Sequence, residues 1–135
     1  MTDLISIVIP TYNSEKTIKR ALNSVLNQSY KKWEAIIIDS YSTDKTIELI
    51  KSYRCKKIKI LYVSKNKGLA KARYIGIKEA RGNIVAFLDS DDDWHKNKLL
   101  YHINFYKLKS AKFTCSAYNL INKKNKKKKN SSKVK

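Results

Sequence analysis

Short apolar runs alternate with amphipathic stretches along most of this chain. Runs rich in Ile, Val and Leu predict buried strands at residues 4–9, 33–38, 58–63 and 84–88. The third run is interleaved with Lys57 and Lys59, so we expect it near a sheet edge, whereas 84–88 has the pattern of a fully buried strand. A further strand is expected at about residues 113–120.

Helical spacing of apolar residues fills the intervals between these strands. The first helix is predicted from positions i, i+3, i+4, i+7 and i+8, which are Ile18, Ala21, Leu22, Val25 and Leu26. Ser42-Thr43-Asp44 has the chemistry of a helix start before the second, and Asn66-Lys67-Gly68 opens a third that runs to Lys78. We expect a fourth helix at about 97–108.

Alternating strands and helices at this spacing predict an α/β fold. The expected architecture is a doubly wound, mostly parallel sheet with flanking helices, joined by right-handed crossovers. One domain should cover residues 1–121. Residues 122–135 contain only Lys, Asn and Ser apart from one Val, which predicts a disordered tail.

An acidic loop, Asp89-Ser90-Asp91-Asp92-Asp93, follows the run at 84–88 directly. Adjacent carboxylates usually mark a solvated turn, because they repel one another and prefer water. However, ligands of open α/β sheets bind where strands end at their carboxyl edge. Carboxylates at such a place suit a hard divalent cation, Mg²⁺ or Mn²⁺, which would in turn hold a phosphate.

Polar segments follow two other strands at the same expected edge. Pro10-Thr11-Tyr12-Asn13 comes after the first strand and Asp39-Ser40-Tyr41-Ser42 after the second. Each segment alone has a plain explanation as a helix cap or strand end. Together with the acidic loop they predict one ligand site built from three strand ends.

These segments, with Leu26-Asn27-Gln28-Ser29-Tyr30 and Asn66-Lys67-Gly68, resemble the family 2 glycosyltransferases. The resemblance covers residues 4–120 in consistent order and matches the N-terminal, nucleotide-sugar-binding half of that family, so the chain looks truncated. It implies the GT-A fold, which is Rossmann-like, and an activity that transfers a hexose from a nucleotide diphosphate sugar with inversion. The implied acceptor is a glycan or a lipid-linked glycan in cell-surface polysaccharide synthesis.

The resemblance also implies roles for individual residues. The metal ligands would be Asp89 and Asp91, with Mn²⁺ or Mg²⁺ bridging the donor diphosphate. Arg73 matches a basic position near the phosphates. The expected nucleotide-binding residues are Pro10, Thr11, Tyr12, Asn13, Asp39, Ser40, Arg73 and Ser90.

The chain departs from the family pattern at the turn after the second strand. Ser40 replaces a second carboxylate there, so it can accept a hydrogen bond from a uracil ring only without charge assistance. UDP remains the favoured donor nucleotide. Tyr41 replaces a glycine and lacks its freedom to adopt positive φ, which predicts a turn of different shape.

No Asp or Glu follows Asp93 in the sequence. The family places its general base well beyond the acidic loop, so the catalytic residue is unknown and we expect it to be absent from this chain. The alternative to an enzyme is therefore an inactive donor-binding module, or a subunit completed by another chain or by a second copy of this one.

The net charge of +19 raises a third hypothesis, a binder of nucleic acid or of a membrane surface. Only four of the 30 basic residues are Arg, and eight Lys lie in residues 122–135. Because Arg is the better reader of phosphates and bases, nucleic acid is not favoured. With no signal peptide or membrane-spanning pattern in view, we expect a cytoplasmic protein with peripheral contact at the inner membrane face.

Overall fold

The computed structural model describes residues 3–64, 68–121 and 127–128. The chain divides into two compact units, Met1–Leu100 and Tyr101–Lys135. The first unit contains the strand ends that the sequence analysis singled out.

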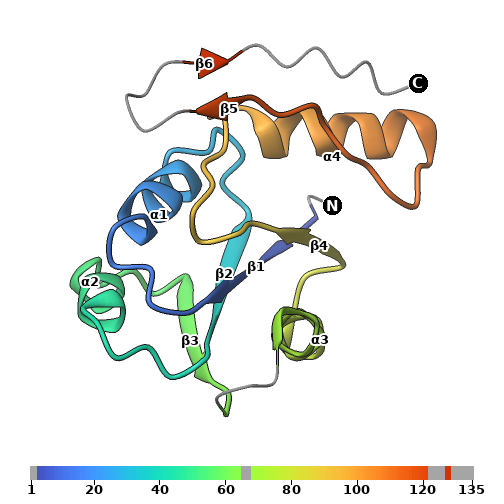
Figure 1. Cartoon of the computed structure of the whole chain (residues 1–135). Coiled ribbons are helices and arrows are strands. Elements are labelled where there is room, and N and C mark those ends of the chain that lie inside the picture. The colour runs from blue at the N-terminus through green and yellow to red at the C-terminus, as the bar shows by residue number, and fades with distance from the viewer. Residues whose placement is uncertain (1–2, 65–67, 122–126, 129–135) are drawn as a thin grey trace. The chain divides into compact units, whose positions relative to one another are not determined.

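The first unit is built on a four-stranded parallel sheet (Figure 1). Its order is β3-β2-β1-β4, so the strand rich in Lys is at an edge, as predicted. Adjacent strands keep a regular register, in which Ile7 pairs with Ala35 and with Ala86. The strands are β1 (Ile5–Thr11), β2 (Trp33–Asp39), β3 (Ile58–Tyr62) and β4 (Ile84–Phe87).

Helices cover both faces of this sheet (Figure 1). α1 (Ile18–Leu26) and α2 (Thr46–Ser52) contact each other on one face, and α3 (Gly68–Glu79) contacts β1 and β2 on the other. α4 (Lys98–Lys109) begins at the end of the first unit. The doubly wound α/β fold predicted from the sequence is therefore confirmed.

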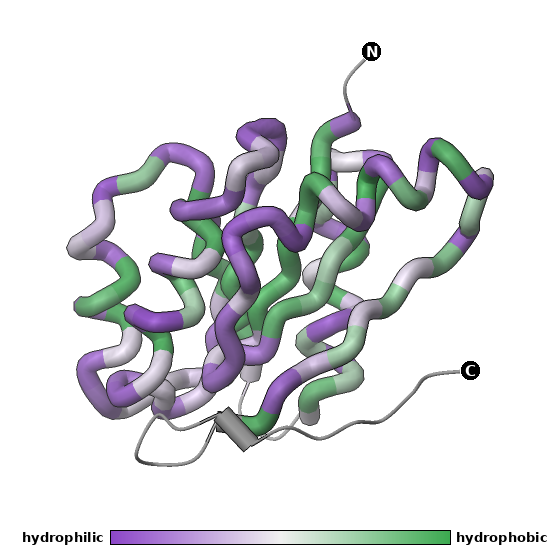
Figure 2. The backbone as a smooth tube through the Cα atoms, turned by 90° about the horizontal axis from the view of Figure 1, so that it is seen from above, coloured by the Kyte–Doolittle hydropathy of each residue, from purple (hydrophilic) through white to green (hydrophobic). Residues whose placement is uncertain are grey.

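Alternation of side chains along the central strands produces two hydrophobic layers. In β1, Ile7 packs with α1 and α2, whereas its neighbour Val8 packs with α3. In β2, Ile37 faces the first layer and Ile36 the second. Both central strands are apolar on both faces because both faces are covered, as the hydrophobic colour along them shows (Figure 2).

α3 packs tightly on β1 because its contact residue is a glycine. A Cβ atom at Gly76 would lie 2.3 Å from Cγ1 of Val8. No real side chain could occupy that position without moving the helix away from the strand. This contact sets how closely α3 packs on β1, and α3 begins at Gly68, which lines the cavity described below.

The prediction of a fully buried strand at 84–88 is wrong. Ile84, Val85 and Ala86 are only partly buried, and Phe87 is 43% exposed, although Leu88 is buried. Within the described residues β4 pairs with β1 alone, so it is an edge strand. Its apolar sequence therefore does not correspond to complete burial.

In the second unit the expected strand at 113–120 is also wrong. Only β5 (Leu120–Ile121) is a strand there, antiparallel to β6 (Lys127–Lys128). Phe113 is 83% exposed, and a strand forms only where a partner strand accepts its hydrogen bonds. The expected helix at 97–108 is confirmed as α4, while the predicted tail at 122–135 lies outside the described residues apart from Lys127–Lys128.

Candidate functional site

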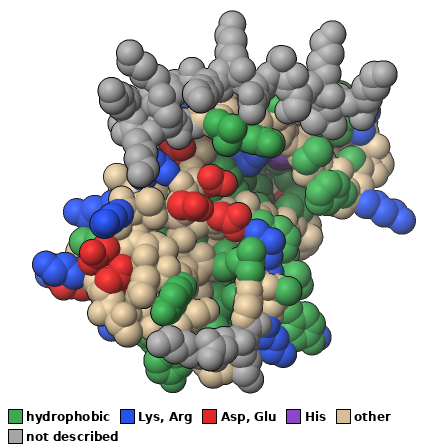
Figure 3. Space-filling view, in the orientation of Figure 1, with side chains coloured by type: hydrophobic (Ala, Val, Ile, Leu, Met, Phe, Trp, Pro, Cys, Tyr) green, Lys and Arg blue, Asp and Glu red, His purple; other side chains and the backbone are tan. Residues whose placement is uncertain are grey.

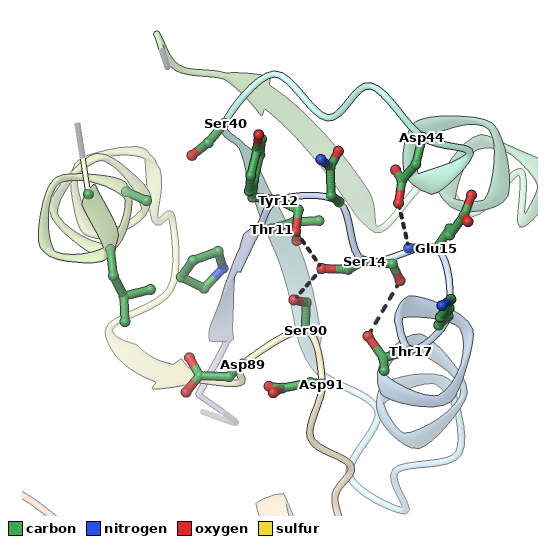
Figure 4. A pocket seen from close by; sticks show the side chains of 16 residues that line it. Thr11, Tyr12, Ser14, Glu15, Thr17, Ser40, Asp44, Asp89, Ser90 and Asp91 are labelled. Carbon is green, nitrogen blue, oxygen red and sulfur yellow. Dashed lines mark hydrogen bonds between the residues drawn. The ribbon is translucent and has the colours of Figure 1, made fainter. Parts of the chain in front are cut away.

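A cavity of about 870 Å³ opens at the carboxyl edge of the sheet (Figure 4). Segments that follow β1, β2 and β4, together with the start of α3, contribute its walls. Figure 4 shows Tyr12 and Ser40 at the end opposite Asp89 and Asp91. The lining residues are Pro10, Thr11, Tyr12, Asn13, Ser14, Glu15, Lys16, Thr17, Ser40, Asp44, Gly68, Leu69, Ala72, Asp89, Ser90 and Asp91.

The loop after β1 connects the other two strand ends. The hydroxyl groups of Ser14 and Ser90 lie 2.8 Å apart and join this loop to the acidic loop. On its other side, Oδ1 of Asn13 accepts a hydrogen bond from the backbone N–H of Thr43 at 2.8 Å. Tyr12 is left 48% exposed, so its ring is available to a ligand. The cavity is thus held open by hydrogen bonds between its walls.

Asp39 organises the turn that follows β2. Its side chain is buried, and its two oxygens accept hydrogen bonds from the N–H of Ser42 at 2.9 Å and from the Ser42 hydroxyl at 2.5 Å. That hydroxyl accepts the N–H of Asn13 in turn. Asp39 does not line the cavity, whereas Ser40 does.

Tyr41 adopts a positive φ of 60° in this turn. The expectation that tyrosine avoids the backbone conformation typical of glycine is therefore wrong. The hydrogen bonds that Ser42 makes to Asp39 and Asn13 hold the turn in shape. For a bulky residue this conformation costs about 1 kcal/mol, which the surrounding bonds must offset.

Glu15 and Asp44 line the cavity and were missed by the sequence reasoning. Oδ2 of Asp44 accepts the N–H of Glu15 at 3.1 Å, and Oε2 of Glu15 accepts the N–H of Lys45 at 3.0 Å. Burial raises the pKa of Asp44, but hydrogen bonds from Thr46 and Glu15 outweigh it and leave the pKa below its ordinary value. These carboxylates clamp two loops together, which gives both of them a structural role in the walls of the cavity.

The acidic loop carries excess negative charge at the opposite end of the cavity. Nη2 of Arg73 lies 2.8 Å from Oδ1 of Asp89, and Arg20 donates to the backbone carbonyl of Asp91. Partial burial and the charges of Asp91 and Asp89 together raise the pKa of Asp92. Figure 3 shows acidic side chains gathered in the middle of the face seen there. A cation would relieve this repulsion.

A divalent cation fits the chemistry of this loop in part. Carboxylate oxygens are the ligands that Mg²⁺ and Mn²⁺ prefer. However, the described residues contain no group of three or more His, Cys, Asp or Glu that could hold a metal ion. Asp89 and Asp91 therefore need oxygens from a ligand or from water to complete a coordination shell.

The Arg73 guanidinium lies beside the acidic loop and uses only some of its N–H donors. Within the described part of the chain, its Nε is buried and lacks a hydrogen-bond partner. Its guanidinium lies 5.7 Å from the centre of the Phe87 ring, which helps to hold it at the end of β4. The guanidinium therefore acts on the cavity through Asp89, whose carboxylate it holds.

The structure therefore brings together eight of the ten predicted residues in one cavity lining, and leaves out Asp39 and Arg73, which brace it. The missed lining residues are Ser14, Glu15, Lys16, Thr17, Asp44, Gly68, Leu69 and Ala72. Position in the loops that join strand to helix was the available signal for most of them. Gly68, Leu69 and Ala72 lie in the segment that resembles the family's Asn-x-Gly element.

Comparison with known proteins agrees with this geometry. The model of the family described as glycosyl transferase family 2 matches residues 6–134. TuaG of Bacillus subtilis (strain 168), named for teichuronic acid biosynthesis, is 39% identical over 120 residues, which are 87% of this chain and 48% of TuaG. The Escherichia coli UDP-Glc:alpha-D-GlcNAc-diphosphoundecaprenol beta-1,3-glucosyltransferase WfgD is 40% identical over 119 residues, or 88% of this chain and 47% of WfgD.

Solved structures of two glycosyltransferases also match most of this chain. S. aureus TarS 1-349 in complex with UDP-GlcNAc superposes with a TM-score of 0.74 at 35% identity, covering 78% of this chain and 31% of that one. The Pyrobaculum calidifontis mannosyltransferase PcManGT, solved with GDP-Man and Mn²⁺, gives 0.69 at 25% identity, covering 78% and 33%. The chain spans about half the length of the curated relatives named above.

Proposed function

The chain belongs to glycosyl transferase family 2, and from this premise we propose that its cavity binds the nucleotide diphosphate of a sugar donor. The observation that carries the proposal is the meeting of three strand ends around one cavity, with exposed Tyr12 at one end and paired carboxylates at the other. A nucleotide diphosphate sugar has the same polarity, with an aromatic base at one end and charged phosphates further along.

In this arrangement the base and ribose lie against the loop after β1. The Tyr12 ring is exposed enough to pack on the base, and the Ser40 hydroxyl can donate or accept a hydrogen bond at its edge. Asp39 supports the two loops that carry Tyr12 and Ser40 through its hydrogen bonds to Ser42. UDP is the favoured nucleotide, since WfgD is named for UDP-Glc and TarS was solved with UDP-GlcNAc.

The diphosphate lies at the acidic loop in this proposal. Asp89 and Asp91 would hold Mn²⁺ or Mg²⁺, as is consistent with Mn²⁺ in PcManGT. When bound, such a cation offsets the negative charge that develops on the departing nucleoside diphosphate. Arg73 pairs with Asp89 on the same side and orients its carboxylate.

Transfer of the sugar needs one more group. As the acceptor hydroxyl attacks the anomeric carbon and the bond to the diphosphate breaks, the hydroxyl proton must pass to a base. Glu15 and Asp44 are hydrogen-bonded to backbone N–H groups, and no Asp or Glu follows Asp93. We therefore propose that this chain by itself binds the donor without transferring its sugar.

Because no general base is identified in this chain, we also propose a second candidate. It is a donor-binding module completed by another subunit or by a second copy of the chain. A full enzyme would serve cell-surface polysaccharide synthesis, in line with the name of TuaG, with a glycan or lipid-linked acceptor such as the one in the name of WfgD. We propose a cytoplasmic site of action with peripheral membrane contact. Within the described residues, no helix is long and apolar enough to cross a membrane.

The proposal is tested by calorimetric titration of the chain with UDP, GDP, CDP and dTDP, each with and without Mn²⁺. We expect UDP to bind most tightly and only in the presence of the metal. If none of the four nucleotides shows metal-dependent binding, the donor site is refuted.

A parallel assay of UDP-sugar hydrolysis and transfer separates module from enzyme. We expect donor binding without turnover. Transfer to an acceptor by the isolated chain would show that a base is present and that the module hypothesis is wrong.

A further inference from the structure

A second cavity, of about 560 Å³, lies between α1 and the loop that continues from the acidic loop. We call it the basic groove. One wall is a polar stripe on α1 and the residues before and after it, and the other is formed by residues 93–96. The lining residues are Lys16, Lys19, Arg20, Asn23, Ser24, Asn27, Asp93, Trp94 and Lys96.

The helical wall of the basic groove follows directly from the periodicity of α1. Its polar residues recur every three or four positions, from Lys16 to Asn27, as a stripe beside the buried one that contains Ile18 and Leu22. A polar stripe on a helix is usually a solvated face. Here a second wall stands opposite it, so the stripe lines a cavity.

Buried hydrogen bonds lock the two walls together. Gln28 is fully buried, and its Nε2 donates to the carbonyl of His95 at 2.9 Å while its Oε1 accepts the N–H of Leu99 at 3.0 Å. The N–H of Ser29 donates to the carbonyl of Lys96 at 2.8 Å. This gives a structural role to the segment around Gln28, which the sequence singled out without a role. The groove is therefore preformed, and a ligand need not order it.

The charge of the basic groove is unbalanced. Four cationic side chains face one carboxylate, that of Asp93. In the described part of the chain, Lys16, Lys19 and Lys96 form no salt bridge. Asn23, Ser24 and Asn27 add neutral polar groups. The Trp94 indole is partly buried against the core, with Nζ of Lys98 5.5 Å from its ring centre, and its remaining surface is the apolar part of the lining. A phosphate group attached to an apolar chain would satisfy both features.

The basic groove adjoins the proposed donor site. Lys16 lines both cavities, and Asp93 and Trp94 continue the loop that carries Asp89 and Asp91. Arg20 lines the groove and also donates to the carbonyl of Asp91. A ligand in the groove thus lies next to the diphosphate end of the donor cavity.

We propose that the basic groove binds the diphosphate of a lipid-linked acceptor. The assignment to an acceptor rests on the proposed function, whereas the affinity for a lipid diphosphate rests on the groove alone. The cationic stripe takes the phosphates and Trp94 takes the first part of the lipid chain.

Geranyl diphosphate is a soluble probe for this proposal. It is titrated into the full chain in EDTA, which disables a metal-dependent donor site, and binding is followed by calorimetry and by tryptophan fluorescence. Trp33 is buried, so a change in fluorescence reports mainly on Trp94. We expect saturable binding that weakens as salt is added.

The double variant Lys19→Glu/Lys96→Glu should bind geranyl diphosphate at least about tenfold more weakly, because two attractive charges become repulsive. The matched control is Lys32→Glu/Lys56→Glu, the same two charge reversals at exposed lysines outside the groove. Equal losses in both variants would mean that the general positive charge binds the probe, and would overturn the proposal.

Two further binding experiments identify the class of ligand that the basic groove takes. Inorganic pyrophosphate should bind more weakly than geranyl diphosphate, since it cannot use Trp94. Vesicles of phosphatidylglycerol and phosphatidylcholine should not displace geranyl diphosphate; displacement that depends on Lys19 and Lys96 would assign the groove to the bilayer surface and overturn the acceptor proposal.

The donor titration keeps the two proposals distinguishable. UDP with Mn²⁺ should bind equally to the unaltered chain and to the Lys19→Glu/Lys96→Glu variant. If UDP binds and geranyl diphosphate does not, the groove proposal fails alone. If geranyl diphosphate binds and UDP does not, the proposed function and the acceptor assignment fail, while the groove stands as a lipid diphosphate site.

Discussion

Acidic side chains lie at both edges of the sheet, and the two edges treat them in opposite ways. At the amino edge, Glu34 is 7% exposed, yet it accepts hydrogen bonds from Ser6 at 2.7 Å and from Arg81 Nε at 2.7 Å and N–H at 2.9 Å. The Ser6 hydroxyl in turn accepts the N–H of Gly82. Burial raises the pKa of Glu34, but these bonds outweigh it and hold the pKa below its ordinary value.

At the carboxyl edge the acidic loop is left without such compensation. Of its four aspartates, Asp89 forms an ion pair with Arg73, whereas Arg20 reaches only the backbone of Asp91. The pKa of Asp92 is raised through partial burial and neighbouring charge. Glu34 is therefore a structural carboxylate whose hydrogen bonds are already made, whereas the acidic loop keeps negative charge that the protein itself does not balance.

The arginine side chains also differ between the two edges of the sheet. Of the four in a chain of 30 basic residues, Arg81 pairs with Glu34, while Arg73 and Arg20 bracket the acidic loop. Arginine offers several directed donors from one planar group, whereas lysine is a mobile point charge. In a sequence so rich in lysine, three of the four arginines therefore stand where directed hydrogen bonds are made.

The largest expected effect comes from Glu34→Ala. Removing the carboxylate leaves the buried Ser6 hydroxyl without an acceptor and should lower the free energy of unfolding by about 2 to 3 kcal/mol. Urea unfolding followed by circular dichroism measures it. UDP affinity in Mn²⁺ should not change under folding conditions, and a selective loss of nucleotide binding would contradict a purely structural role.

Asp91→Asn should weaken nucleotide binding and leave the stability of the fold unreduced. Loss of one of the two charges that we propose as metal ligands is expected to weaken Mn²⁺-dependent UDP binding at least about tenfold. The free energy of unfolding should stay equal or rise, since like charges in the loop no longer repel. Calorimetry and urea unfolding on the same preparation test both halves, and a fall in stability like that of Glu34→Ala would erase the contrast between the edges.

The pH dependence of stability sharpens the comparison further. Because the folded pKa of Glu34 lies below its ordinary value of 4.5, its carboxylate stabilises the fold above that pH, and this stabilisation is lost as pH falls through the folded pKa. The stability gap between the unaltered chain and Glu34→Gln should therefore be about 1 kcal/mol at pH 7 and shrink below pH 4.5. Urea unfolding at a series of pH values measures the gap; a gap that grows on acidification would reverse the sign.

The smallest effect is expected for Glu79→Ala. Its carboxylate lies 2.7 Å from Nζ of Lys59, but both side chains are about half exposed. Such surface pairs contribute less than about 0.5 kcal/mol. Urea unfolding should barely distinguish this variant, and a loss near that of Glu34→Ala would show that burial does not explain the comparison.

Most of the fold of the first unit and half of the cavity lining were predictable from the sequence. The reason is that the carboxyl ends of parallel strands lie at one edge of a sheet, independent of the conformation of the loops. The alternation of runs gave the four strands of the first unit, and the polar segments after them gave eight lining residues. The parts that failed depended on neighbours far along the chain. Ile84–Phe87 has a buried pattern but forms an edge strand, and residues 113–119 have no strand partner in the described structure.

The sequence by itself determined the strand and helix order and the convergence of Tyr12, Ser40 and Asp91 at one edge. These follow from local periodicity and from topology, which need no knowledge of distant contacts. Only the tertiary structure decided that Asp39 braces the turn that follows β2, and that a positive φ at Tyr41 is tolerated. The basic groove also appeared only in the tertiary structure, because the bonds of Gln28 to His95 and Leu99 join segments that are distant in sequence. The same holds for the bond from the Asn13 N–H to the Ser42 hydroxyl, which supports the turn at Tyr41.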